Sequence, residues 1–125
     1  MPRNWVAFQS NSLPVVWARL GRHRFRVLID TGAARSLVAP AVASGLGLRI
    51  VGAERIIGVT GTIASVQMVE LVGVGVGQID LSPFQAGVLE LGLLRLGIQA
   101  ILGVNAFSGR RLQIDFSEGR VYLLS

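Results

Sequence analysis

Apolar residues along this chain occur in short segments that glycine interrupts, a pattern typical of an all-β domain with little helix. In "RFRVLI", residues 24–29, an apolar side chain occupies every second position, which predicts a strand with one buried face. The apolar segment 14–20 precedes it, and Gly21 to His23 lie between the two. The sequence therefore predicts an antiparallel hairpin in this region.

The remainder of the chain predicts one or two short helices and further hairpins. Residues 40–46 carry Pro40 and small residues, which predicts a helical turn. The β-branched arms of "ERIIGVTGTIASVQMVEL", residues 54–71, predict a second hairpin with a small tip. In "QAILGVNAF" a strand ends at Gly103 and a short helix begins near Asn105, before a terminal hairpin. No linker divides these elements, so we expect one domain over residues 1–125.

The Gly-rich segment "VELVGVGVGQIDL", residues 69–81, admits two interpretations. A dinucleotide-binding turn needs a helix directly after its glycines, and no helical pattern follows here. Valine instead recurs at every second position, which favours a strand.

Composition narrows the classes of function. Hydrophobic residues make up 51% of the chain and charged residues 15%, which favours a well-buried core over disorder. The most apolar region, residues 86–107, is interrupted by polar side chains, so we expect no membrane span. The chain has no Cys and one His, His23, which we expect to be exposed. We therefore expect no metal site and no cofactor.

All twelve basic residues are arginine, and the net charge is +5. Four of them, at positions 19, 22, 24 and 26, lie close together, as in a phosphate-binding surface. The few aromatic residues form no stacking motif, however. A solvated hairpin face is the favoured interpretation, and no nucleic-acid partner is expected.

A single carboxylate, Asp30, follows the apolar strand 24–29 and precedes Thr31, Gly32 and Ala33. Asp and Gly are both poor strand residues, so "IDTGA" predicts a strand end that bends into a loop. On these residues alone, Asp30 could simply accept hydrogen bonds from turn amides.

Three further features give this motif a context: two hydrophobic residues before Asp30, Ser36 and apolar residues after it, and "AILGVNAF" about seventy positions downstream. Together they closely resemble the retropepsin-like aspartic proteases, the single-domain relatives of the pepsins. The resemblance extends from about Pro14 to Leu124. It implies an all-β, closed β-barrel domain with a flap hairpin over the active site and one or two short helices.

The resemblance also assigns roles to individual residues. Asp30 would be the catalytic aspartate, supported by an active-site loop of Thr31, Gly32 and Ala33, with Thr31 bonded across a dimer. The flap would comprise Ile57, Gly58, Val59, Thr60, Gly61 and Thr62. The substrate pocket would comprise Leu28, Ala34, Leu37, Gln99 and Ile101, which predicts a preference for apolar residues around the cleaved bond.

One carboxylate per chain implies a homodimer, in which a twofold axis beside Asp30 brings in the second. Two such carboxylates share a proton, and the aspartic protease dyad is itself the standard example of this effect. One then acts as a base toward water while the other polarises the scissile carbonyl of a peptide or protein substrate. Asp80 and Asp115 lack a following Thr-Gly and are expected in turns or at strand edges.

The sequence departs from viral members of the family at two positions. Those proteins usually carry an Asp and an Arg that pair to secure the dimer, where this chain has Ala34 and Val104. Because both partners are absent together, the pattern resembles a cellular or bacterial branch. Arg35 either contacts an acidic substrate residue or is simply solvated. The terminal segments "WVAF" and "VYLL" are candidates for a sheet shared between subunits, although core packing explains them equally well.

Three interpretations of function remain. The first is an active homodimeric aspartic endopeptidase, and the second is a non-catalytic dimerisation or peptide-binding module of the same fold. The third is a protease domain excised from a longer precursor. The sequence shows no secretory signal, which slightly favours the cytoplasm, and leaves the compartment otherwise unknown.

Overall fold

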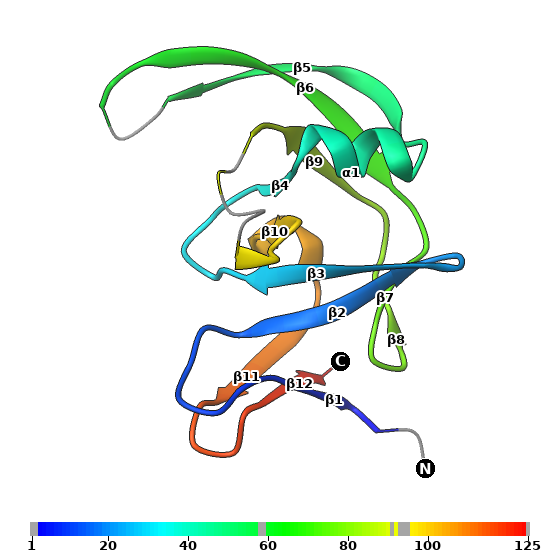
Figure 1. Ribbon diagram of the computed structural model, residues 1–125, viewed down its shortest axis with the longest axis vertical. Coiled ribbons are helices and arrows are strands. Elements are labelled where there is room, and N and C mark those ends of the chain that lie inside the picture. The colour runs from blue at the N-terminus through cyan, green and yellow to red at the C-terminus, as the bar shows by residue number, and fades with distance from the viewer. Residues whose placement is uncertain (1–2, 58–59, 91, 93–95, 125) are drawn as a thin grey trace.

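The computed structural model describes residues 3–57, 60–90, 92 and 96–124, which are mostly strands and confirm the all-β prediction. The described strands form a curled nine-stranded sheet, β5-β6-β9-β4-β10-β3-β2-β7-β8, and a three-stranded sheet, β1-β12-β11 (Figure 1). The elements are β1 (Trp5–Ala7), β2 (Val15–Leu20), β3 (His23–Ile29), β4 (Ser36–Val38), α1 (Pro40–Gly45), β5 (Arg49–Ile57), β6 (Ile63–Leu71), β7 (Val74–Val76), β8 (Ile79–Asp80), β9 (Phe84–Val88), β10 (Ala100–Leu102), the 3₁₀ helix η2 (Val104–Phe107), β11 (Arg111–Asp115) and β12 (Arg120–Leu124).

The predicted first hairpin is β2–β3, and its turn is one residue shorter than expected. His23 pairs with Leu20, so only Gly21 and Arg22 lie in the turn. Gly21 has a φ of 59°, a conformation that glycine adopts without strain. Along β3 the predicted alternation holds, because the apolar side chains at every second position are buried in the core (Phe25, Val27 and Ile29).

Strand β10 lies between two strands that flank the Asp30 loop. It pairs in parallel with β3 and antiparallel with β4, although the paired residues are far apart along the chain (Ala100 with Val27 and with Val38). Ala100 and Leu102 of β10 are almost completely buried. This arrangement anchors both ends of the 30–35 loop on one central strand.

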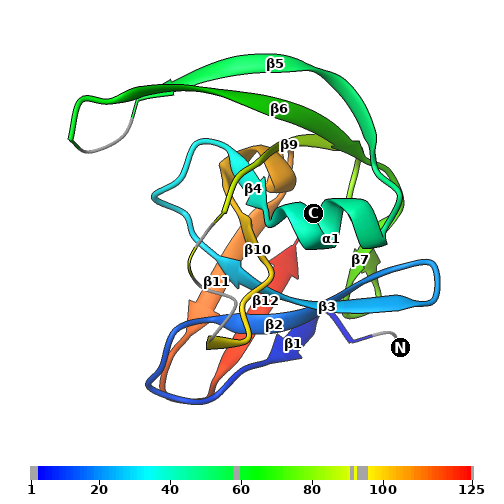
Figure 2. The same cartoon turned by 45° about the horizontal axis from the view of Figure 1, so that its top comes forward.

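The predicted second hairpin is β5–β6, which arches over the rest of the fold (Figures 1 and 2). Its strands pair from Arg49↔Glu70 to Ile57↔Ile63, with a bulge between Ile50 and Gly52. In both views the far end of the hairpin overhangs the side of the molecule that carries the β3–β4 loop. The hairpin can therefore cover that loop.

The segment 69–81 is a set of strands broken by turns rather than one continuous strand. Strand β6 ends at Leu71, and turns that contain Gly73 (φ 82°) and Gly77 (φ 60°) precede β7 and β8. Both glycines occupy the left-handed region, which the valine alternation alone does not reveal. The predicted helices are present as α1 and η2, and η2 begins one residue before Asn105. Within the described chain, neither is long and apolar enough for a membrane span.

The two ends of the chain meet in the small sheet. Strands β11 and β12 form the predicted terminal hairpin, and β1 pairs antiparallel with β12 of the same chain. Val6 and Val121 face each other in this register and are both buried. The terminal segments thus complete a sheet within one chain.

Candidate active site

Asp30 lies half-buried at the end of β3, where the chain leaves the sheet. Its amide donates to the Leu102 carbonyl at 3.0 Å, so β10 fixes its backbone. Its carboxylate oxygen Oδ1 accepts the Gly32 amide at 2.9 Å. A Cβ at Gly32 would lie 3.2 Å from the same oxygen, so a side chain there would crowd the carboxylate. The loop thus holds the Asp30 carboxylate in place and leaves it accessible.

The loop also packs directly on the turn that follows β10. The Val104 amide donates to the Ala33 carbonyl at 2.8 Å. A Cβ at Gly103 would lie 2.5 Å from the Ala33 oxygen and 2.6 Å from the Arg35 oxygen. Position 103 therefore accepts only glycine if the loop is to keep this path.

Behind the loop lies a buried polar contact that sequence reasoning missed. The Ser36 hydroxyl donates to Asn105 Oδ1 at 2.9 Å and accepts the Gly103 amide at 3.0 Å. The Ser36 amide also donates to Asn105 Oδ1, and Asn105 Nδ2 donates to the Gln85 carbonyl. The available signal was a polar residue, Ser36, at a core-facing position of a strand with apolar neighbours.

Three residues predicted for the substrate pocket form one row across the sheet. Ile101 of β10 pairs with Leu28 of β3 on one side and with Leu37 of β4 on the other. Each is half-buried, while its neighbours along the strand are buried. Since side chains alternate across a strand, this row lies on the face opposite the core. The structure therefore brings these three apolar side chains together.

Two hollows flank the loop. The larger of the two, of ≈ 520 Å³, lies between the loop and the β5–β6 hairpin and is lined by Ala33, Ala34, Arg35, Leu37, Arg55 and Ile57. The other hollow, of ≈ 200 Å³, is lined by Asp30 and Thr31 together with Val104, Arg110 and residues of the core. Thr31 is exposed beside Asp30.

Gln99 lies apart from these hollows. Its side-chain oxygen accepts the Arg26 amide at 2.9 Å, and its own amide donates to the Arg26 carbonyl. It lines a different depression, together with His23 and Leu46. Gln99 therefore extends the β10–β3 pairing, and the structure does not bring it to the row of Leu28, Leu37 and Ile101.

The hairpin residues predicted to contact substrate are only partly described. Gly58 and Val59 lie outside the described residues. Ile57 and its cross-strand partner Ile63 are 71% and 58% exposed, which is high for isoleucine. Beyond them, the Thr60 and Thr62 hydroxyls lie 3.0 Å apart, and Gly61 has a φ of 81°. The end of the hairpin thus presents apolar side chains without a covering layer.

Charged side chains gather at the outer end of the larger cleft. Arg35 forms an ion pair with Glu54 of β5, which joins the loop to the hairpin. Arg55 lines the same cleft, and its guanidinium forms no hydrogen bond or ion pair with the described residues. Among these residues, the cleft therefore carries one positive charge that no carboxylate neutralises.

The other two aspartates, Asp80 and Asp115, each end a strand at the edge of a sheet. Asp80 ends β8 and pairs with Arg19 at 3.2 Å. Asp115 accepts hydrogen bonds from the Glu118 amide and the Ser117 hydroxyl, which hold the pKa of its carboxyl below the ordinary value. In the part of the chain that is described, no three His, Asp or Glu side chains lie close enough to hold a metal.

An Asp-Thr-Gly loop on a curled β-sheet defines the class to which this chain belongs. A family model described as Aspartyl protease matches residues 16–106, so the chain is a member of the aspartyl protease family. Its fold is retropepsin-like. It is similar to the crystal structure of a retropepsin-like aspartic protease from Rickettsia conorii, with a TM-score of 0.66, 17% sequence identity, and coverage of 97% of this chain and 91% of the other. No curated protein sequence matches the chain.

Proposed function

We propose that the protein is an aspartic endopeptidase that acts as a homodimer. The position of Asp30 carries this proposal: its carboxylate is fixed by Gly32, accessible, and located beside a cleft that the β5–β6 hairpin overhangs. One chain supplies one carboxylate to this site. A second, related by a twofold axis, completes the pair that peptide hydrolysis requires.

The proposed chemistry uses these two carboxylates and one water molecule. The ionised Asp30 removes a proton from the water as its oxygen attacks the scissile carbonyl carbon, and the protonated Asp30 donates its proton to the carbonyl oxygen. The carboxyl that took the proton from water then transfers it to the amide nitrogen, and the C–N bond breaks as the other carboxylate takes back a hydroxyl proton. The amine and the carboxylic acid are released, and one carboxyl is again protonated. Thr31 is positioned beside Asp30 to bond with its counterpart in the partner.

Substrate selection follows from the row of apolar side chains and from the cleft that Leu37 of this row lines. The row of Leu28, Ile101 and Leu37 offers apolar contacts to side chains near the cleaved bond, and Ala34 leaves space for the substrate backbone. The β5–β6 hairpin acts as a flap: its exposed Ile57 and Ile63 gain apolar burial when it closes on an extended peptide. The unneutralised Arg55 favours an acidic residue at the outer end of the bound peptide.

The test is cleavage of a diverse peptide library from about pH 3 to about pH 8, since paired acid and base groups give a bell-shaped profile. Enzyme concentration is varied, and Asp30→Asn is prepared identically. We expect activity that rises more steeply than linearly with enzyme concentration and falls roughly 10²–10⁴-fold in Asp30→Asn. A statine-type transition-state mimic should inhibit the reaction.

Sedimentation of the same samples separates the alternatives. A folded dimer that binds peptides without cleaving them would identify a peptide-binding module instead. Cleavage by the monomer, at a rate proportional to its concentration, would support protease activity but contradict the proposed homodimer.

A further inference from the structure

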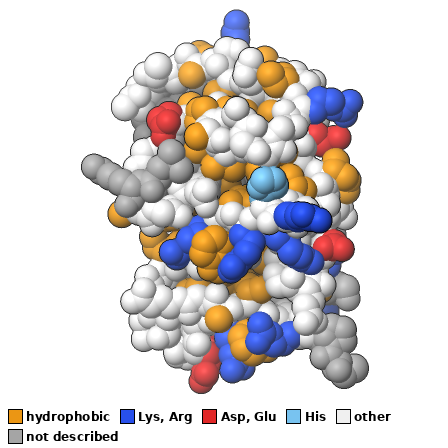
Figure 3. Space-filling model, turned by 45° about the vertical axis from the view of Figure 1, so that its right-hand side comes forward, with side chains coloured by type: hydrophobic (Ala, Val, Ile, Leu, Met, Phe, Trp, Pro, Cys, Tyr) orange, Lys and Arg blue, Asp and Glu red, His pale blue; other side chains and the backbone are white. Residues whose placement is uncertain are grey.

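The outer face of the β2–β3 hairpin carries an arginine cluster around Trp17. The Arg24 guanidinium lies 4.4 Å from the centre of the Trp17 ring, and the Arg26 guanidinium lies 5.6 Å from it. Arg19 follows on the same face of β2, because side chains two residues apart share a face. Figure 3 shows arginines gathered around apolar side chains on this face, close to the lone histidine.

The strand register places like charges opposite each other. Arg19 pairs directly with Arg24, and Trp17 pairs with Arg26. Like charges in directly opposed positions destabilise a hairpin, so this arrangement costs folding free energy. A sequence that keeps an unfavourable pair at a rigid, exposed position often does so for a binding function.

The arginines border an open cavity of ≈ 330 Å³ between β1, β2 and β7. Arg3, Arg19 and Arg24 line it together with Trp17 and Gly75. A Cβ at Gly75 would occupy the space of the Arg19 guanidinium, so glycine allows that side chain to lie flat on β7. The volume is at the lower end of small-molecule sites, which begin at about 300 Å³.

Two guanidinium nitrogens of the cluster are buried and have no hydrogen-bond partner among the described residues: Arg19 Nη1, whose residue lines this cavity, and Arg26 Nε, whose residue does not. Buried donors in folded proteins are nearly always paired, with water or an ion where no protein group is available. The orphaned donors therefore indicate that this cluster is suited to an acceptor from outside the chain.

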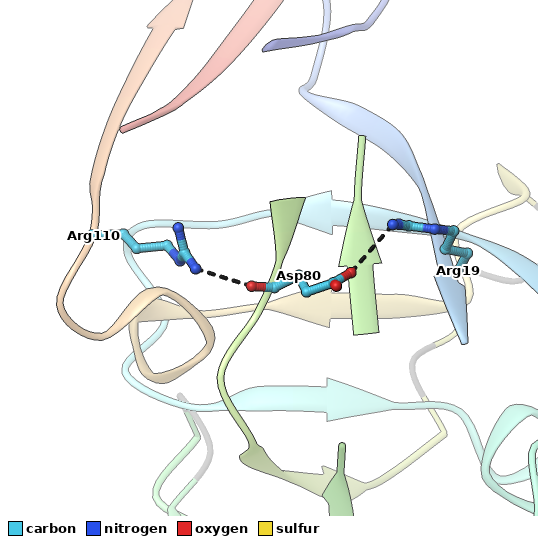
Figure 4. Close-up of polar contacts among 3 residues, drawn as sticks. All are labelled: Arg19, Asp80 and Arg110. Atoms are coloured by element: carbon cyan, nitrogen blue, oxygen red, sulfur yellow. Dashed lines mark hydrogen bonds and ion pairs between the residues drawn. The ribbon is translucent and has the colours of Figure 1, made fainter. Parts of the chain in front are cut away.

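The only carboxylate bonded to the cluster within the described residues is Asp80. Its Oδ1 accepts from Arg19 at 3.2 Å, and its main-chain carbonyl accepts from Arg110 at 2.9 Å (Figure 4). These two contacts approach Asp80 from opposite sides and fix its position. Arg24 and Arg26 have no carboxylate partner in the described structure, so the cluster keeps an excess of positive charge.

We propose that the cavity bounded by Trp17, Arg19 and Arg24 binds a phosphate group, carried by a small phosphorylated molecule or by a phospholipid headgroup. Guanidinium groups match phosphate oxygens in geometry, and stacking on Trp17 holds Arg24 in place before the ligand arrives. Several arginines converge on one small cavity, which suits the three oxygens and double charge of a phosphate better than a single carboxylate. This site is independent of Asp30 and of proteolysis.

The first experiment is an NMR titration of the full chain with inorganic phosphate, followed at the Trp17 indole and arginine side-chain signals. Sodium chloride of equal ionic strength controls for screening. We expect saturable shifts with phosphate alone. Arg24→Gln should weaken binding about tenfold or more, because it removes a charged hydrogen-bond donor. Arg49→Gln, which removes an arginine bonded to Glu70 on β5–β6, is the matched control and should bind as the parent does.

Gly75→Ala provides a second variant that preserves every charge. The added Cβ displaces the Arg19 guanidinium, so binding should weaken although the net charge is unchanged. Near-ultraviolet circular dichroism confirms that the variant is folded. The proposal would be overturned if phosphate and chloride caused equal changes in the NMR chemical shifts. It would also be overturned if Arg24→Gln and Gly75→Ala both bound phosphate as tightly as the parent.

Sedimentation with vesicles distinguishes a phospholipid headgroup from a small phosphorylated molecule as the ligand. Binding to vesicles of phosphatidylglycerol and phosphatidylcholine, but not of phosphatidylcholine alone, and its loss in Arg24→Gln, assigns a lipid headgroup. Phosphate binding without vesicle binding assigns a soluble phosphorylated ligand. A glutamate-rich peptide that binds at these residues more tightly than phosphate would reject the phosphate assignment.

Discussion

The Ser36 hydroxyl and the Asn105 side-chain oxygen lie 2.9 Å apart, although 69 positions separate the two residues in the sequence. Ser36 is fully buried on β4, and Asn105 lies in η2. Because Asn105 also bonds to the Gln85 carbonyl of β9, this contact joins three segments directly behind the Asp30 loop. The contact therefore positions the loop without touching substrate.

Asn105→Ala tests the contribution of this contact to stability. The substitution leaves the buried Ser36 hydroxyl and amide without their acceptor, so the free energy of unfolding should fall by about 2–3 kcal/mol. Urea denaturation measures the change. Gln67→Ala, at an exposed position of β6, is the control and should stay within about 0.5 kcal/mol of the parent. Equal stability of the two variants would show that Asn105 is not structural.

Gly103→Ala tests the close packing of β10 on the loop. The new Cβ would meet the Ala33 and Arg35 carbonyl oxygens at about 2.5 Å, so the loop must move and carry Asp30 with it. We expect peptide hydrolysis to fall by roughly 10²-fold, as misplacement of catalytic groups by about 1 Å does elsewhere. Gly45→Ala, at the end of α1, changes a glycine that has open space around it and no positive φ, and it controls for the loss of a glycine. Retained activity in Gly103→Ala would contradict the described packing.

Arg55→Glu tests whether the outer cleft selects acidic residues. Reversal of the unpaired charge should reduce the preference for a Glu-containing peptide over its Gln-containing counterpart by roughly 2–5-fold, since exposed charge pairs are weak. The ratio of kcat/KM values for the two peptides measures this, and it should diminish at high salt. Arg49→Glu, on the same strand but outside the cleft, should leave the ratio unchanged.

Asp115 predicts an acid-sensitive terminal hairpin. Hydrogen bonds from the Glu118 amide and then the Ser117 hydroxyl lower the pKa of its carboxyl from the ordinary value. A carboxyl whose pKa is lower in the folded than in the unfolded state stabilises the fold at any pH above its unfolded-state pKa. This stabilisation is lost as the pH falls through the folded-state pKa. Asp115→Asn should therefore be less stable than the parent near neutral pH and equal to it in strong acid. Urea denaturation from neutral pH to strong acid measures the free energy of unfolding of both proteins. A difference between them that does not change with pH would contradict the prediction.

The local parts of the fold could be predicted from the sequence. The alternation in 24–29 fixes the buried face of β3, and Asp-Thr-Gly marks its end because these residues suit a loop. The breaks between strands in residues 69–81 could not be predicted. Valine alternates through this segment, and it continues through glycines whose positive φ values turn the chain.

Long-range register limited the prediction of the site. Leu28, Leu37 and Ile101 were identified from resemblance, and their contact depends on β10 lying between β3 and β4. The same register places Gln99 beside Arg26 rather than in the apolar row. For Asn105 the sequence predicts only the start of a short helix, because nothing in its immediate neighbours indicates that it bonds to Ser36.

Strand β1 pairs with β12 of its own chain, so all three strands of the terminal sheet come from one chain. In the proposed function, folding and activation would then be separate events, because one folded chain holds only one carboxylate of the proposed catalytic pair. While monomers predominate, the amount of dimer rises with the square of the protein concentration. The proposed protease would thus work as a sensor of its own abundance, silent when dilute and active where chains accumulate.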